Sequence, residues 1–186
     1  MASTSDFRTG MVLMIDGEYY SIVEFQHVKV GRGGAFVRTK LKNFKTDRVV
    51  EKTFRGGEKV DEARVERHKM QYLYQEADSL VLMDQETFDQ LHVPVEMIGD
   101  NLAFLKEGEI IDVLMHGEIP LGVEIPTFVI LQVTSTEPGV KGDTVSGATK
   151  KAVVETGGEI QVPLFLEEGT MVKVDTRTGE YIERVK

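Results

Sequence analysis

The chain has 186 residues, of which 22 are Lys or Arg and 31 are Asp or Glu, and it contains no Cys and no Trp. A hydrophobic fraction of 41% beside 28% charged residues is ordinary for a globular protein and excludes a disordered chain. The absence of Cys excludes disulfides, thiolate metal sites and cysteine nucleophiles. No apolar run approaches the roughly 20 residues of a membrane helix, and the first residues do not form a signal peptide. We therefore expect a cytoplasmic protein with no membrane partner.

The net charge of −9 is distributed unevenly along the chain. Residues 1–64 carry 12 basic and 9 acidic side chains, whereas residues 65–128 carry 3 and 13, and residues 129–186 carry 7 and 9. Between Lys29 and Lys59 there are 10 basic and 3 acidic residues. A basic segment in an otherwise acidic chain indicates a surface that binds nucleic acid, although a solvated lysine-rich strand explains the charge equally well.

The first third of the sequence predicts antiparallel strands. Two β-rich runs flank Asp16-Gly17, a pair that supplies the positive φ angles of a type I′ hairpin turn. Glycine clusters separate the runs that follow, and no proline interrupts them. The expected strands cover residues 11–15, 18–23 with a continuation through residue 28, 35–43 and 48–54.

The strand over residues 35–43 has a strict period of two. Its apolar or uncharged side chains on one face are Val37, Thr39 and Leu41. Its cations on the other face are Arg38, Lys40 and Lys42. Because successive side chains of a strand point to opposite sides, this alternation predicts one buried face and one face lined with positive charge.

The remaining two thirds follow the same pattern, with one exception. Residues 94–105 are the best helix candidate, because a proline stands at their start. Turns are expected near residues 77–78 and from Thr176 to Gly179. The expected strands cover residues 69–74, 79–83, 109–115, 119–124, 128–134, 152–155, 159–162, 171–174 and 181–184.

Short strands at regular spacing, separated by turn residues, are typical of β-barrels and sandwiches. Three segments of about 60 residues each suit three small barrels, which are marginally stable alone but feasible when docked on one another. The predicted fold is therefore all-β, with three small β-barrel domains.

No catalytic or cofactor-binding motif is found in the sequence. The four histidines are scattered without the spacing of metal ligands, and no nucleophile elbow occurs. Residues 142–150 resemble a phosphate-binding loop, but Ala148 occupies the position of the required lysine. Residues 32–39 approach the strand pattern of an RNA recognition motif, but Gly34 and Thr39 replace two of its aromatic residues. We therefore expect no enzyme, no metal site and no cofactor.

The loop between the two long strands is the strongest indication of function. In Gly31, Arg32, Gly33 and Gly34, three glycines surround one arginine. The simplest interpretation is a hairpin turn that needs positive φ angles. The functional interpretation is a narrow loop that approaches RNA closely and presents a planar, permanently charged guanidinium.

Several segments of the chain, in this order, resemble bacterial elongation factor P. The resemblance covers essentially the whole chain, and its last stretch is the most specific. A eukaryotic and archaeal relative, initiation factor 5A, lacks the third domain, so the resemblance points to the bacterial family. The matching segments are residues 31–35, 40–43, 70–74, 138–144, 156–157, 160–165, Gly169 and 172–181.

The resemblance implies a domain division and a function. An SH3-like, KOW-like barrel would cover residues 1–64, and two OB-fold barrels would cover residues 65–127 and 128–186 in an L-shaped outline similar to that of tRNA. The family implies a monomeric translation factor that binds the 70S ribosome between the peptidyl-tRNA and exit sites. It would stimulate peptide-bond formation and rescue ribosomes stalled at consecutive prolines.

The resemblance also implies roles for individual residues. Arg32 would contact the acceptor end of the peptidyl-tRNA. Many members have a lysine there that receives a β-lysyl extension, so Arg32 argues against lysylation and leaves rhamnosylation, or no modification, open. The C-terminal family motif includes Arg177 and Tyr181.

Three further contacts with the ribosome are expected. The acidic middle domain would face a basic partner, in the family the ribosomal stalk protein near the exit site. The basic face that would bind ribosomal RNA consists of Lys29, Arg38, Lys40 and Lys42. The contact with the exit-site codon or the small subunit would come from Gly142, Asp143 and Thr144.

Arginine cannot act as a base near neutral pH, so Arg32 would position the reactants and would not transfer protons.

The alternative function is that of a general single-stranded RNA-binding protein built on OB folds. That function would require exposed aromatic side chains along a basic groove, whereas residues 65–186 are acidic.

Overall fold

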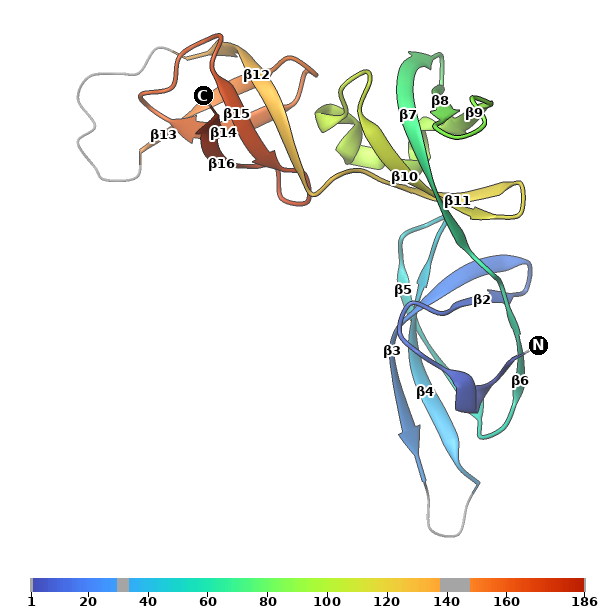
Figure 1. Cartoon of the computed structure of the whole chain (residues 1–186). Coiled ribbons are helices and arrows are strands. Elements are labelled where there is room, and N and C mark those ends of the chain that lie inside the picture. Colours follow the sequence, from blue (N-terminus) through green and yellow to red (C-terminus); the bar gives the residue numbers. More distant parts are fainter. Residues whose placement is uncertain (1, 30–33, 138–147, 186) are drawn as a thin grey trace. The chain divides into compact units, whose positions relative to one another are not determined.

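The computed structural model describes residues 2–29, 34–137 and 148–185. These residues form sixteen β-strands and three short 3₁₀ helices, so the expected all-β fold is confirmed (Figure 1). The chain divides into two compact units, one made of Met1–His68 with Val113–Gly122 and the other of Lys69–Asp112 with Val123–Lys186. Among the described residues, no helix has the length and apolar character needed to cross a membrane.

The first sheet follows the order β1-β6-β2-β3-β4-β5. The β2–β3 hairpin turns at Asp16 and Gly17 with φ angles of 53° and 83°, as the predicted type I′ turn requires. The strands β1 and β6 were not predicted, because β1 has only two residues and β6 contains a single apolar residue, Val60, so neither displays an alternation. The bounds are β1 (Ala2–Ser3), β2 (Val12–Ile15), β3 (Glu18–Val28), β4 (Phe36–Asn43), β5 (Val49–Arg55) and β6 (Lys59–Glu62). A 3₁₀ helix, η1 (Thr4–Asp6), follows β1.

The core of the first sheet is closed by large aliphatic side chains that are almost completely buried. Leu13 and Ile22 are inaccessible to solvent, and the rings of Phe7 and Phe54 meet edge to face with centroids 5.4 Å apart. Thr39 is also buried, and its hydroxyl donates a hydrogen bond of 2.7 Å to the carbonyl of Lys52. A hydroxyl that is satisfied in this way can replace an aliphatic side chain in the core without a large cost.

The second sheet follows the order β11-β10-β7-β8-β9. Its strands are β7 (Glu66–Glu76), β8 (Ser79–Asp84), β9 (Gln90–Pro94), β10 (Ile110–His116) and β11 (Ile119–Glu124). The predicted helix over residues 94–105 is wrong in part, because Pro94 ends β9 and two 3₁₀ helices follow, η2 (Val95–Met97) and η3 (Gly99–Phe104). Gly99 adopts a φ of 57°, which a continuous α-helix cannot accommodate.

The third sheet follows the order β14-β13-β12-β15-β16, with β12 at its centre. Alternate residues of β12, namely Val129, Leu131 and Val133, are at most 5% exposed and form the middle of its core. All five predicted strands of this segment are present. Their bounds are β12 (Phe128–Thr136), β13 (Thr149–Val154), β14 (Glu159–Pro163), β15 (Met171–Asp175) and β16 (Glu180–Val185).

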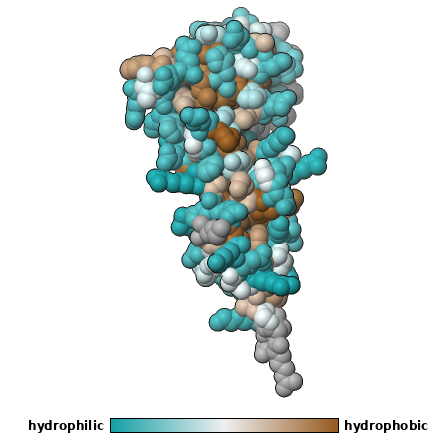
Figure 2. All heavy atoms as spheres, turned by 90° about the vertical axis from the view of Figure 1, so that its right-hand side faces the viewer, coloured by the Kyte–Doolittle hydropathy of each residue, from teal (hydrophilic) through white to brown (hydrophobic). Residues whose placement is uncertain are grey.

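Several large apolar side chains remain accessible on the surface. Figure 2 shows one face, where hydrophilic side chains predominate and apolar ones appear in separate areas. The most exposed large apolar residues among those described are Phe88, at 69%, and Phe165, at 67%. Single exposed apolar side chains are normal for a soluble domain, so their local surroundings decide whether they matter.

Within the second unit, Phe104 of η3 packs against the core of the third sheet. Two glycines make room for it: a Cβ at Gly158 would lie 2.6 Å from the carbonyl oxygen of Ala103, and a Cβ at Gly179 would lie 3.3 Å from the Phe104 ring. The hydroxyl of Thr156 donates a hydrogen bond of 2.6 Å to the same Ala103 carbonyl. The Phe104 ring and a hydrogen bond from a side-chain hydroxyl to a backbone carbonyl therefore join η3 to the third sheet.

The β15–β16 turn is held by the buried carboxylate of Asp175. This carboxylate accepts hydrogen bonds from Arg177, at 2.9 Å from the backbone nitrogen and 2.6 Å from Nη2. Hydrogen bonding from the Arg177 guanidinium keeps the pKa of Asp175 below its usual value. The adjacent hydroxyl of Thr176 donates to the carbonyl of Pro126 at 2.8 Å.

We predict that Phe104→Ala lowers the free energy of unfolding by about 1–3 kcal/mol, because a partly buried ring leaves a cavity against the core. Phe165→Ala removes the same ring from an exposed turn of the same unit, and it should change stability by less than about 0.5 kcal/mol. Urea denaturation followed by circular dichroism gives both values. Equal effects of the two substitutions would show that the Phe104 contact contributes nothing.

We also predict a pH dependence for the contribution of Asp175. A carboxyl whose folded pKa is depressed stabilises the protein above its unfolded pKa of about 3.9, and this contribution is lost as the pH falls through the folded pKa. The Tm difference between wild type and Asp175→Asn should therefore be largest above about pH 5 and shrink below about pH 4. Arg177→Ala should remove most of this pH dependence. A Tm difference that stays constant from about pH 3 to 7 would contradict the assignment.

Candidate nucleic-acid interface

The site is built on the long hairpin of β3 and β4. The two strands pair in antiparallel fashion from Tyr20↔Asn43 to Val28↔Phe36, so they lie side by side along the first sheet (Figure 1). The pairing stops where the predicted loop begins. Gly34 is described and exposed. The other predicted loop residues, Gly31, Arg32 and Gly33, lie outside the described residues.

The predicted alternation of β4 is confirmed. Val37, Thr39 and Leu41 are each 1% exposed. The cations that alternate with them, Arg38, Lys40 and Lys42, are exposed. The fold therefore presents three positive charges in a row on one side of the hairpin, about two residues apart.

Cross-strand neighbours neutralise part of this row. The Nζ atom of Lys40 lies 2.6 Å from a carboxylate oxygen of Glu24 on β3. Hydrogen bonding to Glu24, together with its negative charge, raises the pKa of Lys40. The Nζ atom of Lys42 lies 2.6 Å from a carboxylate oxygen of Asp47. Exposed pairs of this kind contribute little to stability, so a phosphate can exchange with the carboxylate at small cost.

The two cations nearest the loop differ from Lys40 and Lys42 in having no carboxylate partner among the described residues. Lys29 and Arg38 are both exposed, and neither forms an ion pair with any residue that the structure describes. Arg38 lies opposite Gln26 on one side and Thr53 on the other, both uncharged. Among the described residues of the hairpin, the positive charge without an ion-pair partner therefore lies at the loop end.

Residues of the C-terminal family motif occupy the third sheet. Tyr181 is partly buried and packs against the core, and Arg177 is engaged by Asp175. The predicted contact residues Gly142, Asp143 and Thr144 belong to the β12–β13 connection and lie outside the described residues.

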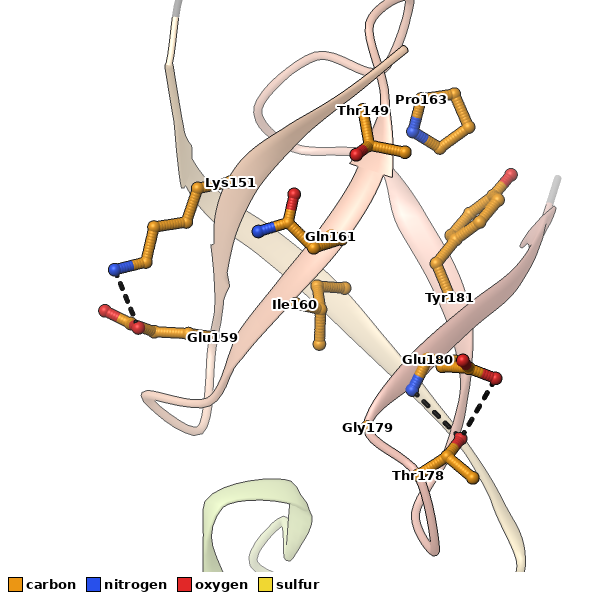
Figure 3. Close-up of a pocket in the computed structure, with 10 residues that line it drawn as sticks. All are labelled: Thr149, Lys151, Glu159, Ile160, Gln161, Pro163, Thr178, Gly179, Glu180 and Tyr181. Carbon is orange, nitrogen blue, oxygen red and sulfur yellow. Dashed lines mark hydrogen bonds and ion pairs between the residues drawn. The ribbon is translucent and has the colours of Figure 1, made fainter. Parts of the chain in front are cut away.

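A groove of 540 Å³ lies beside Tyr181 (Figure 3). It is lined by residues of β13, β14 and β16, including Thr149 and Gln161, which the sequence analysis did not predict as contact residues. Among the described lining residues the one cation, Lys151, is paired with Glu159 at 2.7 Å. Because the lining also contains the carboxylate of Glu180, the groove suits hydrogen-bonding groups better than it suits phosphates.

The middle segment presents acidic turns. Glu76 ends β7 and Asp78 lies in the β7–β8 turn, and Glu86 and Asp89 lie in the β8–β9 turn; all four are exposed. In the β8–β9 turn Phe88 adopts a φ of 64°, an unusual conformation for a bulky residue. No cluster of His, Asp and Glu able to hold a metal ion occurs among the described residues.

Solved structures with a similar fold belong to translation factors. "Eukaryotic translation initiation factor 5A from Methanococcus jannaschii" is 24% identical, with a TM-score of 0.50, over 67% of this chain and 90% of that one. A "Translation initiation factor eif-5a family protein" from Naegleria fowleri is 16% identical, also with a TM-score of 0.50, over 67% of this chain and 96% of its own. At these identities the likeness concerns the fold alone.

Three family models match successive parts of the chain. The elongation factor P KOW-like domain matches residues 3–60, the elongation factor P OB domain residues 65–123, and the elongation factor P C-terminal model residues 129–184. The predicted order of a KOW-like barrel followed by OB-fold domains is thereby confirmed. The family is one of translation factors and not of enzymes.

Curated relatives match over the full length. Elongation factor P of Moorella thermoacetica is 56% identical over 99% of this chain and 100% of its own. The elongation factor P of Acetivibrio thermocellus is 54% identical over the whole of both chains, and that of Acidothermus cellulolyticus is 56% identical over 99% of this chain and 98% of its own. The chain therefore belongs to the elongation factor P family of translation factors.

Proposed function

We propose that this chain binds the 70S ribosome as a monomer between the peptidyl-tRNA and exit sites. There it stimulates peptide-bond formation and rescues ribosomes stalled at consecutive prolines. The observation that carries the proposal is the β3–β4 hairpin, in which Lys29 and Arg38, the two cations nearest the Arg32 loop in sequence, form no ion pair with a described residue. Membership of a translation factor family supports the same function.

In this proposal Arg32 acts by position and charge. Its guanidinium braces the acceptor end of the peptidyl-tRNA, so that the peptidyl ester carbonyl and the incoming amine of proline hold a reactive geometry. The ribosome supplies the chemistry, and the proton of the attacking amine does not pass through Arg32, because a guanidinium does not titrate near neutral pH. Correct positioning can contribute up to roughly 7–11 kcal/mol in favourable cases.

The row of cations would attach the first domain to ribosomal RNA. Arg38 and Lys29 can meet phosphates directly, whereas Lys40 and Lys42 must first exchange their carboxylate partners. Phosphate contacts of this kind supply affinity and orientation without sequence preference. In this proposal the Arg32 loop, and not these phosphate contacts, positions the acceptor end of the peptidyl-tRNA.

We propose three domains, over residues 1–64, 65–127 and 128–186, each with its own partner on the ribosome. The third domain would contact the exit-site codon or the small subunit through Gly142, Asp143 and Thr144, where an aspartate can accept a hydrogen bond from a base amino group. The groove beside Tyr181 supports this, because it lies over the second and third strands of the barrel, where OB folds bind their ligands.

The middle domain would bind a basic ribosomal protein, which we propose to be the stalk protein near the exit site. Its exposed acidic turns would be repelled by RNA phosphates and attracted to a cationic protein surface. Phe88 lies among these acidic residues, and a strained, exposed aromatic side chain is a suitable apolar anchor for a protein partner.

A general affinity for single-stranded RNA is less well supported, because the Tyr181 groove carries more acidic than basic groups.

We predict that Arg32→Ala leaves the stability within about 0.5 kcal/mol of wild type and lowers ribosome affinity only modestly. The rate of peptide-bond formation between prolines should nevertheless fall towards the rate without factor, because the brace at the tRNA end is lost. A reconstituted translation assay on a message with three consecutive proline codons measures this rate. Circular dichroism serves as the folding control.

Arg32→Lys is the matched variant. It keeps the charge but not the planar fork, so it should give partial activity when no lysine-modifying enzyme is present. If Arg32→Ala rescued stalled ribosomes as well as wild type, the positioning role of Arg32 would be wrong. Tight binding of wild type to unstructured RNA without ribosomes would favour the general RNA-binding function.

We predict that reversing the charges of Glu76, Asp78, Glu86 and Asp89 to Lys weakens ribosome binding by about tenfold at low salt, and less at high salt. The control reverses four other exposed or partly exposed acidic residues and so changes the net charge equally. These are Glu137, Glu167, Glu168 and Glu183. If the first variant binds the ribosome as tightly as the control or more tightly, the acidic residues of the middle domain do not contact a ribosomal protein. Their acidity would then serve solubility alone.

A further inference from the structure

The turn between β5 and β6, from Arg55 to Glu58, is tied to two distant parts of the first unit. One is the N-terminal segment around Thr4, and the other is Ala35, the residue just before β4. Neither segment is a neighbour of the turn in sequence. The turn therefore connects the start of the chain with the base of the Arg32 loop.

Thr4 fixes the conformation of this turn. Its side chain is 1% exposed, and its backbone nitrogen donates to the carbonyl of Glu58 at 3.0 Å. Its hydroxyl donates to the carbonyl of Arg55 at 3.2 Å and accepts from the backbone nitrogen of Gly57 at 2.8 Å. Glu58 closes the turn from within, because its carboxylate accepts from the backbone nitrogen of Arg55 at 2.7 Å. A buried hydroxyl that satisfies two backbone groups at once holds them in one arrangement.

Gly56 links this fixed turn to Ala35, at the base of the Arg32 loop. Its backbone nitrogen donates to the carbonyl oxygen of Ala35 at 2.7 Å. A Cβ at Gly56 would lie 2.8 Å from that oxygen and 3.0 Å from the Cβ of Ala35. Glycine is required here by the close approach of two backbones, and any side chain would push Ala35 away by about half an ångström.

We propose that the β5–β6 turn, locked by Thr4, is a brace that holds Ala35, the residue that links the Arg32 loop to β4, in one position. Gly56 and Thr4 are then positioning residues for the tRNA contact, and neither touches the tRNA. This inference rests on the proposed function of Arg32. β5 pairs with β4 from Phe36↔Arg55 to Lys42↔Val49, and the hydrogen bond from Gly56 to Ala35 extends this pairing one residue beyond β4. The locked turn thereby holds the backbone of Ala35 at the base of the loop.

The test compares two glycines of the same unit. In Gly56→Ala the new methyl group meets the Ala35 backbone, whereas in Gly122→Ala it lies 3.6 Å from the Phe44 ring, an ordinary contact. With saturating factor, Gly56→Ala should slow proline–proline bond formation about tenfold, while the half-saturating concentration changes less than about twofold. Gly122→Ala should match wild type in both values.

Thr4 provides a second pair of variants that does not depend on a steric clash. Thr4→Val keeps the shape but removes the hydroxyl, and Thr4→Ser keeps the hydroxyl. Thr4→Val should slow bond formation at saturating factor and speed hydrogen exchange of the Gly57 amide, measured by NMR. Thr4→Ser should restore both towards wild type.

Arg32→Ala, measured in parallel, distinguishes a failure of the proposed brace from a failure of the proposed role of Arg32. If Arg32→Ala is inactive while Gly56→Ala and Thr4→Val keep the full saturated rate, the brace is wrong and the role of Arg32 stands. If Arg32→Ala is fully active, the positioning role of Arg32 is wrong, and the brace, which rests on that role, is wrong with it. A loss that appears only in the half-saturating concentration would also overturn the brace, because it would place these residues in attachment to the ribosome.

Discussion

The pairing of β3 with β4 is the constraint on which the candidate site depends. Its register sends Val37, Thr39 and Leu41 into the core and leaves the intervening cations outside. A slip of one residue would bury the cations and expose the core side chains, so the hydrophobic effect that stabilises the barrel also fixes the charged face. The pairing of β4 with β5 on its other side brings Ala35, at the base of the Arg32 loop, against Gly56, which links the stability of the barrel to the position of the loop base.

Much of the fold could be predicted from the sequence, because local signals encode it. Asp16-Gly17 specified a type I′ turn, and the alternation in β4 specified its buried face. The helix over residues 94–105 could not be predicted correctly, because the start signal of Pro94 was real but Gly99 takes a positive φ that interrupts the helix. Very short strands such as β1 depend on tertiary pairing with β6, which leaves no pattern in two residues.

The candidate site was less predictable, because its electrostatics depend on register. The sequence identified Lys40 as part of a basic face, but its partner, Glu24, lies on the neighbouring strand, and only the pairing of β3 with β4 brings them together. The groove beside Tyr181 is likewise assembled from three strands. Gly56 could be read as a turn residue, but its close approach to Ala35 is a property of the folded barrel.

The central claim is that the factor acts through a fixed positive charge that positions the tRNA and exchanges no proton. The most direct measurement is the ratio of proline–proline bond formation rates with and without saturating factor, followed from about pH 6.5 to 8.5. The ionisation of the attacking amine affects both rates and cancels in the ratio. Because a guanidinium does not titrate in this range, the account predicts a constant ratio. A ratio that rises or falls through an apparent pKa within this range would contradict it, because an ionising group of the factor would then take part in the reaction.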